Sequence, residues 1–261
     1  MSSPTGPTDA RPLKVRISDD IRARIEAGSY PAGSRLPTLD TLASEYMCSL
    51  AAVRDALDLL RQQGLVITKQ GLGSFVRERA KARRHGIERY SRSRWGGASG
   101  KAVLIAEGEA QGRNVQQLIR ELGEVPASTA VAARLGVSPG EAVWVRRRLT
   151  LIDSRPNQLA DSYYKLSLVD IVPMLREENT GPGGGFARIE EAGVRLAEIA
   201  EELAARMPTG PETITLRLPE GTPVVELMRT TYDLNGQPVE VMHAVIAGDM
   251  AEFAYRFPIP D

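Results

Sequence analysis

The sequence predicts an α+β protein with two domains, a small helical domain followed by a larger domain built on an antiparallel sheet. Two patterns lead to this prediction: apolar residues recur at helical spacing over residues 13–60, and β-forming runs occur at residues 143–152, 224–232 and 238–247. A chain of 261 residues, 42% of them apolar, also has enough material for two hydrophobic cores.

Residues 1–12 are rich in proline and small polar residues, and such a segment cannot bury enough apolar surface to offset its ordering entropy. We expect a loose tail there. A first helix is expected over residues 13–27, because isoleucines recur every four residues and place one apolar stripe on its side: Ile17, Ile21 and Ile25.

Two more helices are expected after residue 37. Each shows apolar residues at the spacing of one helix face, with Leu39, Leu42, Ala43 and Tyr46 on the first and Val53, Ala56, Leu57 and Leu60 on the second. Thr38 and Ser49 suit the N-cap positions, because a hydroxyl oxygen can accept a bond from a free backbone N–H of the first turn. Only Met47 and Cys48 separate the helices, which is about right for the sharp turn of a helix-turn-helix.

A hairpin is expected after the third helix. Gly64 can end that helix in the left-handed conformation. The β-forming runs 65–68 and 74–77 flank the short segment 69–73, which contains Gly71 and Gly73. The hairpin would form a wing, so residues 13–78 are predicted to be a winged helix-turn-helix, a fold that binds DNA.

The same stretch resembles the DNA-binding domain of the GntR family of bacterial repressors. The resemblance lies in the run from Ile25 to Pro37, in Leu42-Ala43, in Val53 to Leu57, in Gly64-Leu65 and in Lys69 to Val76. It implies a recognition helix in the major groove of a double-stranded DNA operator and a wing tip in the minor groove. The DNA-contacting residues it implies are Arg35, Thr38, Ser49, Ala51, Ala52, Arg54, Lys69, Gln70 and Gly71.

Arg54 is the strongest single candidate, because a guanidinium can fork onto guanine or clamp a phosphate. The alternative is an internal ion pair with Asp58, four residues further along the helix. Two departures from the family pattern are Leu50, where an arginine is usual, and Thr38-Leu39-Asp40, where a Ser-Glu-Arg-like run is usual. We therefore expect an operator that differs from the commonest family type.

Residues 79–100 are predicted to be a basic linker. They hold glycines and many cations, among them Arg83, Arg84, Arg89, Arg92 and Arg94. These arginines are expected either to add sequence-independent phosphate contacts or simply to be solvated.

Residues 101–261 are predicted to form an antiparallel α+β domain. β-forming runs cover residues 143–152, 224–232 and 238–247, and helical patterns cover 129–135 and 186–192. Asn235-Gly236 separates two of the runs and is a strong hairpin signal.

This second domain resembles the chorismate-lyase-like UTRA domain of the HutC subfamily, which binds an effector and forms dimers. The resemblance lies in Arg134 to Gly140, Trp144 to Leu149, Asp161 to Tyr163, Gly221 to Val224, Arg229 to Asp233, Gly236 to Glu240 and Gly248-Asp249. It implies a homodimer and a small-molecule effector.

Arg146 and Arg148 alternate on one expected strand, so both lie on the same face and are suited to bind an anion. With similarity to the sugar-phosphate sensors of the family, the expected effector-binding residues are Arg146, Arg148, Tyr163, Arg188 and Glu240. Those sensors often carry a tyrosine near the position of Ile246, so a sugar phosphate is not the only candidate. The alternative is that these arginines are ordinary surface or ion-paired residues.

Composition argues against several other functions. One cysteine, Cys48, excludes an internal disulfide and a cysteine-cluster metal site, and no nucleophile, nucleotide or metal motif stands out around His243. We therefore expect no cofactor. No apolar run is long enough to span a bilayer, and no signal peptide is evident, so we expect a cytoplasmic protein with no membrane partner.

The charges are divided unevenly along the chain. Residues 1–95 hold 17 Lys and Arg against 10 Asp and Glu, and residues 96–261 hold 16 against 23. A basic part next to an acidic part favours nucleic-acid binding at one end.

The sequence thus predicts a DNA-binding transcription regulator, a repressor released from its operator by an effector, and not an enzyme. Two alternatives remain open: a constitutive DNA-binding repressor without an effector, and a protein whose C-terminal domain is catalytic.

Overall fold

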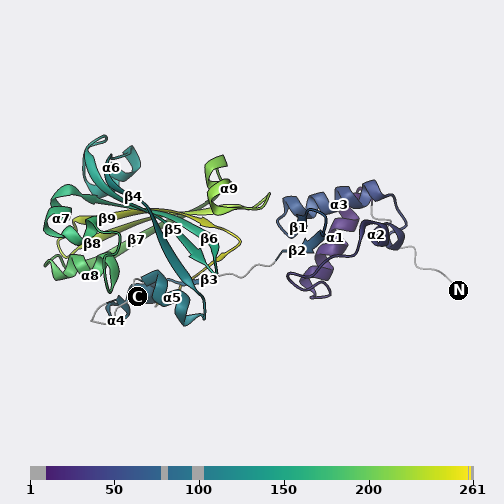
Figure 1. The fold of residues 1–261 in the computed structure, drawn as a ribbon, viewed down its shortest axis with the longest axis horizontal. Coiled ribbons are helices and arrows are strands. Elements are labelled where there is room, and N and C mark those ends of the chain that lie inside the picture. The colour runs from purple at the N-terminus through teal and green to yellow at the C-terminus, as the bar shows by residue number, and fades with distance from the viewer. Residues whose placement is uncertain (1–9, 78–81, 96–102, 258, 260–261) are drawn as a thin grey trace. The chain divides into compact units, whose positions relative to one another are not determined.

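The computed structural model describes residues 10–77, 82–95, 103–257 and 259. The chain forms two compact units that divide in sequence near residue 80 (Figure 1). The N-terminal unit holds three helices, α1 (Leu13–Glu26), α2 (Leu39–Glu45) and α3 (Leu50–Gln62), and a two-stranded sheet of β1 (Val66–Lys69) and β2 (Gly73–Val76).

Capping residues mark the start of α2 and both ends of α3, as the sequence predicts. Thr38 Oγ1 accepts a hydrogen bond from the Thr41 amide at 3.2 Å, and Ser49 Oγ accepts one from the Ala52 amide at 3.3 Å. Gly64, just beyond α3, has a φ of 65°, the left-handed value expected of a residue that ends a helix. Met47 also has a positive φ, 50°, so the turn between α2 and α3 is made by a non-glycine residue.

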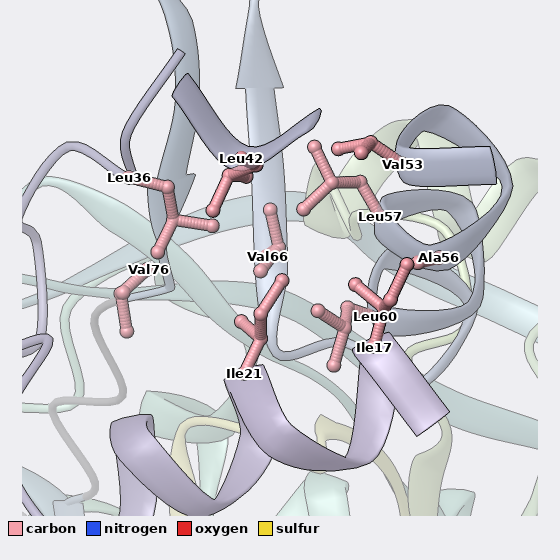
Figure 2. Packing of buried hydrophobic residues seen from close by; sticks show 10 residues of the cluster. All are labelled: Ile17, Ile21, Leu36, Leu42, Val53, Ala56, Leu57, Leu60, Val66 and Val76. Carbon is pink, nitrogen blue, oxygen red and sulfur yellow. The ribbon is translucent and has the colours of Figure 1, made fainter. Parts of the chain in front are cut away.

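The core of this unit is formed by helix residues that the spacing predicted together with Leu36, Val66 and Val76, and Figure 2 shows these side chains pointing toward a common centre. Ile17 and Ile21 come from α1, Leu42 comes from α2, and the strands close the core from the other side. Burial of this many branched side chains stabilises the unit, at about 1.5–3 kcal/mol for each fully buried residue. The buried cluster is Ile17, Ile21, Leu36, Leu42, Val53, Ala56, Leu57, Leu60, Val66 and Val76.

The C-terminal unit is built on a six-stranded antiparallel sheet of order β4-β5-β6-β9-β8-β7. The predicted β-forming runs are the strands β5 (Ala142–Ile152), β8 (Val224–Asp233) and β9 (Pro238–Ala247), and the turn at Asn235-Gly236 joins β8 to β9 as expected. The other strands of the sheet are β4 (Val115–Pro126), β6 (Arg155–Lys165) and β7 (Leu196–Arg206).

Helices cover both faces of this sheet, and Figure 1 shows α6 (Thr129–Leu135) and α9 (Gly210–Leu216) on one side and α4 (Arg92–Trp95) and α5 (Val103–Ala110) on the other. On the α6 face, Val143 and Val241 of the sheet pack against Val131 and Leu135. The unit also contains α7 (Leu166–Ile171), the 3₁₀ segment η2 (Pro173–Arg176) and α8 (Gly184–Glu191), which begins two residues before the predicted helix.

The predicted linker is wrong for residues 82–95. This segment forms β3 (Ala82–His85), the 3₁₀ segment η1 (Ile87–Tyr90) and α4, and β3 pairs in parallel with β10 (Ala251–Ala254) near the C-terminus. The physical reason is aromatic burial, because Trp95 is 4% exposed and its ring meets the Phe186 ring edge-on at 5.8 Å. The basic composition of the segment predicted a solvated linker and gave no indication of this packing. The remainder of the predicted linker lies outside the described residues.

Candidate DNA-binding face and candidate effector cavity

Arg54 lies exposed on α3, and its guanidinium makes no hydrogen bond or ion pair with any described residue. The alternative ion pair between Arg54 and Asp58 does not form, and the carboxylate of Asp58 pairs with Arg61 instead. Arg61 also donates a hydrogen bond to Thr68 Oγ1 at 2.8 Å. A cation held on a rigid helix and not used inside the fold is available for an external anion.

Three of the predicted DNA contacts surround one hollow in the N-terminal unit. Arg35, Thr38 and Arg54 line this hollow, whose volume is about 350 Å³, together with Arg61. Gly73 makes room for Arg35, because a Cβ at that position would lie 3.2 Å from Arg35 Nε. The fold therefore brings the start of α2, the middle of α3 and the base of the wing together.

The remaining predicted DNA contacts lie at the first turn of α3 and at the wing tip. Ser49 and Ala51 are exposed and Ala52 is half-buried. In the wing, Gln70 and Gly71 are exposed, and Gly71 has a φ of 73°, which a residue without a Cβ adopts without strain. Lys69 is also exposed, and its Nζ lies 4.6 Å from the centre of the Phe75 ring.

A cavity of about 910 Å³ opens on the α5 side of the C-terminal sheet, and Arg146 and Arg148 of β5 both line it, as the alternation predicts. Three further arginines line the same cavity: Arg84, Arg89 and Arg229. The glycine-rich segment 181–185 forms part of its wall.

Arg146 and Arg148 donate to neutral acceptors. Arg146 is 5% exposed, and its guanidinium donates to the carbonyl oxygens of Leu175 (2.7 Å), Glu177 and Glu178 (3.2 Å). Burial lowers the pKa of Arg146, and the positive charge of Arg148 adds to this effect. Arg148 donates to Ser162 Oγ. Neither arginine donates to a carboxylate among the described residues, so both positive charges are left without a bonded counter-charge.

Glu240 lies 3% exposed beneath this cavity and has partners on two sides. Its Oε1 accepts a hydrogen bond from Tyr164 Oη at 2.8 Å, and its Oε2 pairs with Arg229 Nη2 at 2.5 Å. Burial alone would raise the pKa of Glu240, but the charges of Arg229 and Arg148 and the bonds from Tyr164 and Ser162 hold it below its usual value. Glu240 is therefore a carboxylate that orders the cavity floor.

Two of the predicted effector residues do not line this cavity. Tyr163 packs on the opposite face with the α6 cluster, and its neighbour Tyr164 takes the expected place, because successive strand residues point to opposite faces. Arg188 donates to the Pro182 carbonyl at 3.1 Å and pairs with Glu191 at 2.6 Å, so it fixes the glycine-rich segment from outside the lining.

The sequence analysis missed Arg229 and Tyr164 as cavity residues and assigned Arg84 and Arg89 to a linker. A signal for Arg229 was present, since the turn at Asn235-Gly236 places Thr231 opposite Glu240, and period two then puts Arg229 on the same face. For Arg84 and Arg89 no pattern separated a buried arginine from a solvated one.

No group of three metal-ligating side chains occurs within the described parts of the chain. None of the helices described there is long and apolar enough to cross a bilayer.

A capped helix-turn-helix with a wing, followed by a sheet domain with an arginine-lined cavity, is the architecture of a transcription regulator that combines a DNA-binding domain with a sensor domain. The family comparisons agree with this class: residues 13–76 match the bacterial regulatory proteins of the gntR family, and residues 110–252 match the UTRA domain. The chain belongs to the GntR family of regulators that carry a UTRA domain.

Individual relatives cover nearly the whole chain. An uncharacterised helix-turn-helix transcriptional regulator of Streptomyces coelicolor is 34% identical over 94% of this chain and 92% of its own length. The Escherichia coli repressor of the mannosyl-D-glycerate transport and metabolism system, MngR, is 26% identical over 88% of this chain and 89% of its own length. A crystal structure of a GntR-family transcriptional regulator matches 96% of this chain and 99% of its own, with 28% identity and a TM-score of 0.67.

Proposed function

We propose that this protein is a homodimeric transcription repressor that binds a double-stranded DNA operator and is released when a small anionic molecule fills the cavity of the C-terminal unit. The observation that carries the effector part is the pair Arg146 and Arg148, which line the cavity and donate only to neutral acceptors among the described residues. A repressor of this kind acts in the cytoplasm, where the bacterial chromosome lies.

The DNA part of the proposal is supported by the free guanidinium of Arg54 and by its position beside Arg35 and Thr38. Hydrogen bonds from arginine to guanine edges give sequence specificity, and contacts to phosphates give affinity that depends on salt. Because the usual family arginine is replaced by Leu50, Arg54 and the wing carry a larger share of recognition in this proposal.

The anionic effector is supported by charge and size. Two arginines on one strand face can bind a phosphate or carboxylate through several charge-assisted hydrogen bonds. The cavity volume of about 910 Å³ falls in the range of sites that enclose small molecules.

Release requires that the effector bind better to the dimer geometry that does not fit the operator. Dimers of helix-turn-helix proteins read half-sites about one helical turn apart, so a change in the spacing of the two N-terminal units lowers operator affinity. An effector with equal affinity for both geometries would release nothing.

A gel-shift assay with the upstream region of its own gene tests the DNA part, and absence of binding at low salt would overturn it. Thermal-shift screening of phosphorylated and carboxylated metabolites, followed by the same gel shift, tests the effector part. Operator binding that no cavity ligand changes would support a constitutive repressor instead. Sedimentation equilibrium of the full chain tests the dimer.

A further inference from the structure

Two of the arginines in the cavity come from the short segment that directly follows the DNA-binding unit. Arg84 lies on β3 and is 7% exposed, and Arg89 lies in η1 and is 2% exposed. Both line the cavity that Arg146 and Arg148 also line. The proposed function gives no role to Arg84 or Arg89.

These two arginines gather with Arg229 around one tyrosine. Arg84 Nη2 lies 3.0 Å from Tyr90 Oη, and the guanidinium groups of Arg89 and Arg229 lie 5.4 Å and 5.6 Å from the centre of the Tyr90 ring. Arg146, in contrast, is bonded to carbonyl oxygens that follow η2. Arg84, Arg89 and Arg229 therefore form one group around Tyr90, and the carboxylate of Glu240 is joined to this group through its pair with Arg229.

The hydrogen-bonding capacity of the Tyr90 group is only partly used. Arg84 pairs with Glu201 at 2.6 Å and Arg89 pairs with Glu107 at 3.2 Å. Buried N–H groups without an acceptor remain at Arg84 Nε, Arg89 Nε, Arg89 Nη1 and Arg229 Nε. Native proteins pair the great majority of such buried donors, so a cluster of unpaired ones beside a cavity points to a missing acceptor.

The charges around Arg89 have opposing effects on its pKa. Burial lowers the pKa of Arg89 to about 10 and the positive charges of Arg84 and Arg229 add to this shift, whereas the carboxylate of Glu107 opposes it. Each of the three arginines pairs with one carboxylate, and an anion bound beside them would supply oxygen acceptors for the N–H groups that these pairs leave without a partner.

We propose that Arg84, Arg89 and Arg229 form a second anion-binding subsite, so that the effector is a molecule with two separate acidic groups, one bound at Arg146 and Arg148 and one at the Tyr90 group. This inference rests on the proposed function, because it takes the Arg146 and Arg148 subsite as the first anchor. It goes further by requiring a bis-acidic effector and by making the segment 82–90 part of the binding site.

The test uses alkanediol monophosphates and the matching bisphosphates of increasing chain length, with affinities measured by calorimetry on the full chain. At the best length, the bisphosphate is expected to bind at least about tenfold more tightly than the monophosphate of that length, because the second phosphate binds at a high effective concentration. Arg89→Gln is expected to remove most of this advantage, because it weakens the bisphosphate much more than the monophosphate. Arg148→Gln is expected to weaken both ligands.

Arg92→Gln is the matched control, since Arg92 lies two residues beyond that segment, is exposed and pairs with Glu190 at 3.0 Å outside this cavity. It should change neither affinity. Arg89→Gln leaves the buried carboxylate of Glu107 with one partner fewer. The double variant Arg89→Gln/Glu107→Gln therefore serves as a second test, because it removes both charges of the pair. Circular dichroism checks that each variant is folded.

The outcomes separate the two proposals. If the wild-type chain binds monophosphates through Arg148 and bisphosphates bind no better at any length, or if the advantage survives both Arg89 variants, the second subsite is wrong and the proposed function stands. If the wild-type chain binds neither series, the anionic effector itself is overturned together with the subsite.

Discussion

Arg229 Nη2 lies 2.5 Å from Glu240 Oε2, and the two side chains are 10% and 3% exposed. Arg229 also lies beside two aromatic rings, with its guanidinium 5.0 Å from the centre of the Phe186 ring and 5.6 Å from that of Tyr90. The ion pair thus links β8 to β9 beneath the cavity. It also fixes the orientation of Arg229, which lines the cavity and contacts the rings of Phe186 and Tyr90.

Glu240→Ala should destabilise the C-terminal unit by about 3–5 kcal/mol, because it leaves the Arg229 charge buried without its partner. Trp95 and Trp144 both lie in this unit, so tryptophan fluorescence during urea unfolding reports on it. The control is Glu252→Ala, which removes an exposed pair with Arg83 at 3.4 Å and should cost less than about 1 kcal/mol. Equal losses for the two variants would contradict this account.

Acid sensitivity should arise partly from Glu212. Hydrogen bonds from Arg206, together with bonds from Thr209, lower the pKa of Glu212 from 4.5 to about 2 in the folded chain. Since the folded pKa is the lower one, the stabilisation is complete above pH 4.5 and is lost as the pH falls toward 2. Glu212→Gln should therefore flatten the stability curve over this interval, as measured by thermal unfolding at fixed ionic strength. Glu124→Gln, an exposed residue of β4, should leave the curve unchanged.

Ser49 allows the capping and DNA-binding roles to be separated. Ser49→Ala should lower the stability of the N-terminal unit by about 1 kcal/mol, because the Ala52 amide loses its acceptor. Ser49→Asp should keep the cap and the stability but place a negative charge where the family resemblance predicts a contact with the anionic DNA. We expect the aspartate variant to melt like the wild type and to bind operator DNA at least about tenfold more weakly. If it binds as well as the wild type, Ser49 does not face DNA.

Arg54→Ala should reduce specific operator affinity by about 10- to 100-fold if the guanidinium reads a base. The control Arg22→Ala changes the charge equally, but Arg22 lies on α1, where it pairs with Asp19 at 3.3 Å and donates to Gln63 at 2.6 Å. Fluorescence anisotropy with specific and non-specific duplexes distinguishes base reading from phosphate binding. Parallel losses on both duplexes would assign Arg54 to the backbone.

Gly183 should tolerate no side chain, whereas Gly193 should tolerate one at moderate cost. Both have a positive φ, 78° and 89°, so alanine strains the backbone by about 1–2 kcal/mol at either position. At Gly183 a Cβ would also collide with the Trp95 carbonyl oxygen, whereas nothing lies within 4 Å of one at Gly193. Gly183→Ala should therefore melt at a clearly lower temperature than Gly193→Ala. It should also disturb the cavity wall and so weaken monophosphate binding.

The sequence alone predicts those helices and strands for which local conformational preference and burial agree. In the N-terminal unit, caps, helix spacing and glycine turns all indicated the observed elements. β7 shows the opposite case, because its sequence, Leu-Ala-Glu-Ile-Ala-Glu-Glu-Leu-Ala-Ala-Arg, consists largely of good helix formers. It is a strand because β8 pairs with it along its length, and that tertiary contact overrides local preference.

For the candidate effector cavity, the alternation on β5 predicted that Arg146 and Arg148 share one face, and both line the cavity. The choice between Tyr163 and Tyr164 could not be made, because the register of β6 against β5 and β9 decides which of the two faces the cavity. The burial of Arg84 and Arg89 could not be predicted from the sequence for another reason. Their burial depends on Glu201 and Glu107, which are distant in sequence and become partners only when the sheet has formed.

The parallel pairing of β3 with β10 places the beginning and the end of the C-terminal unit beside each other, with Ala82 opposite Ala251 and His85 opposite Ala254. A domain whose ends are adjacent can be inserted into a surface loop of an unrelated protein without forcing that loop apart. The unit is therefore suited to serve as a transplantable module, in which ligand occupancy of the cavity would be reported by the activity or fluorescence of a host enzyme or fluorescent protein.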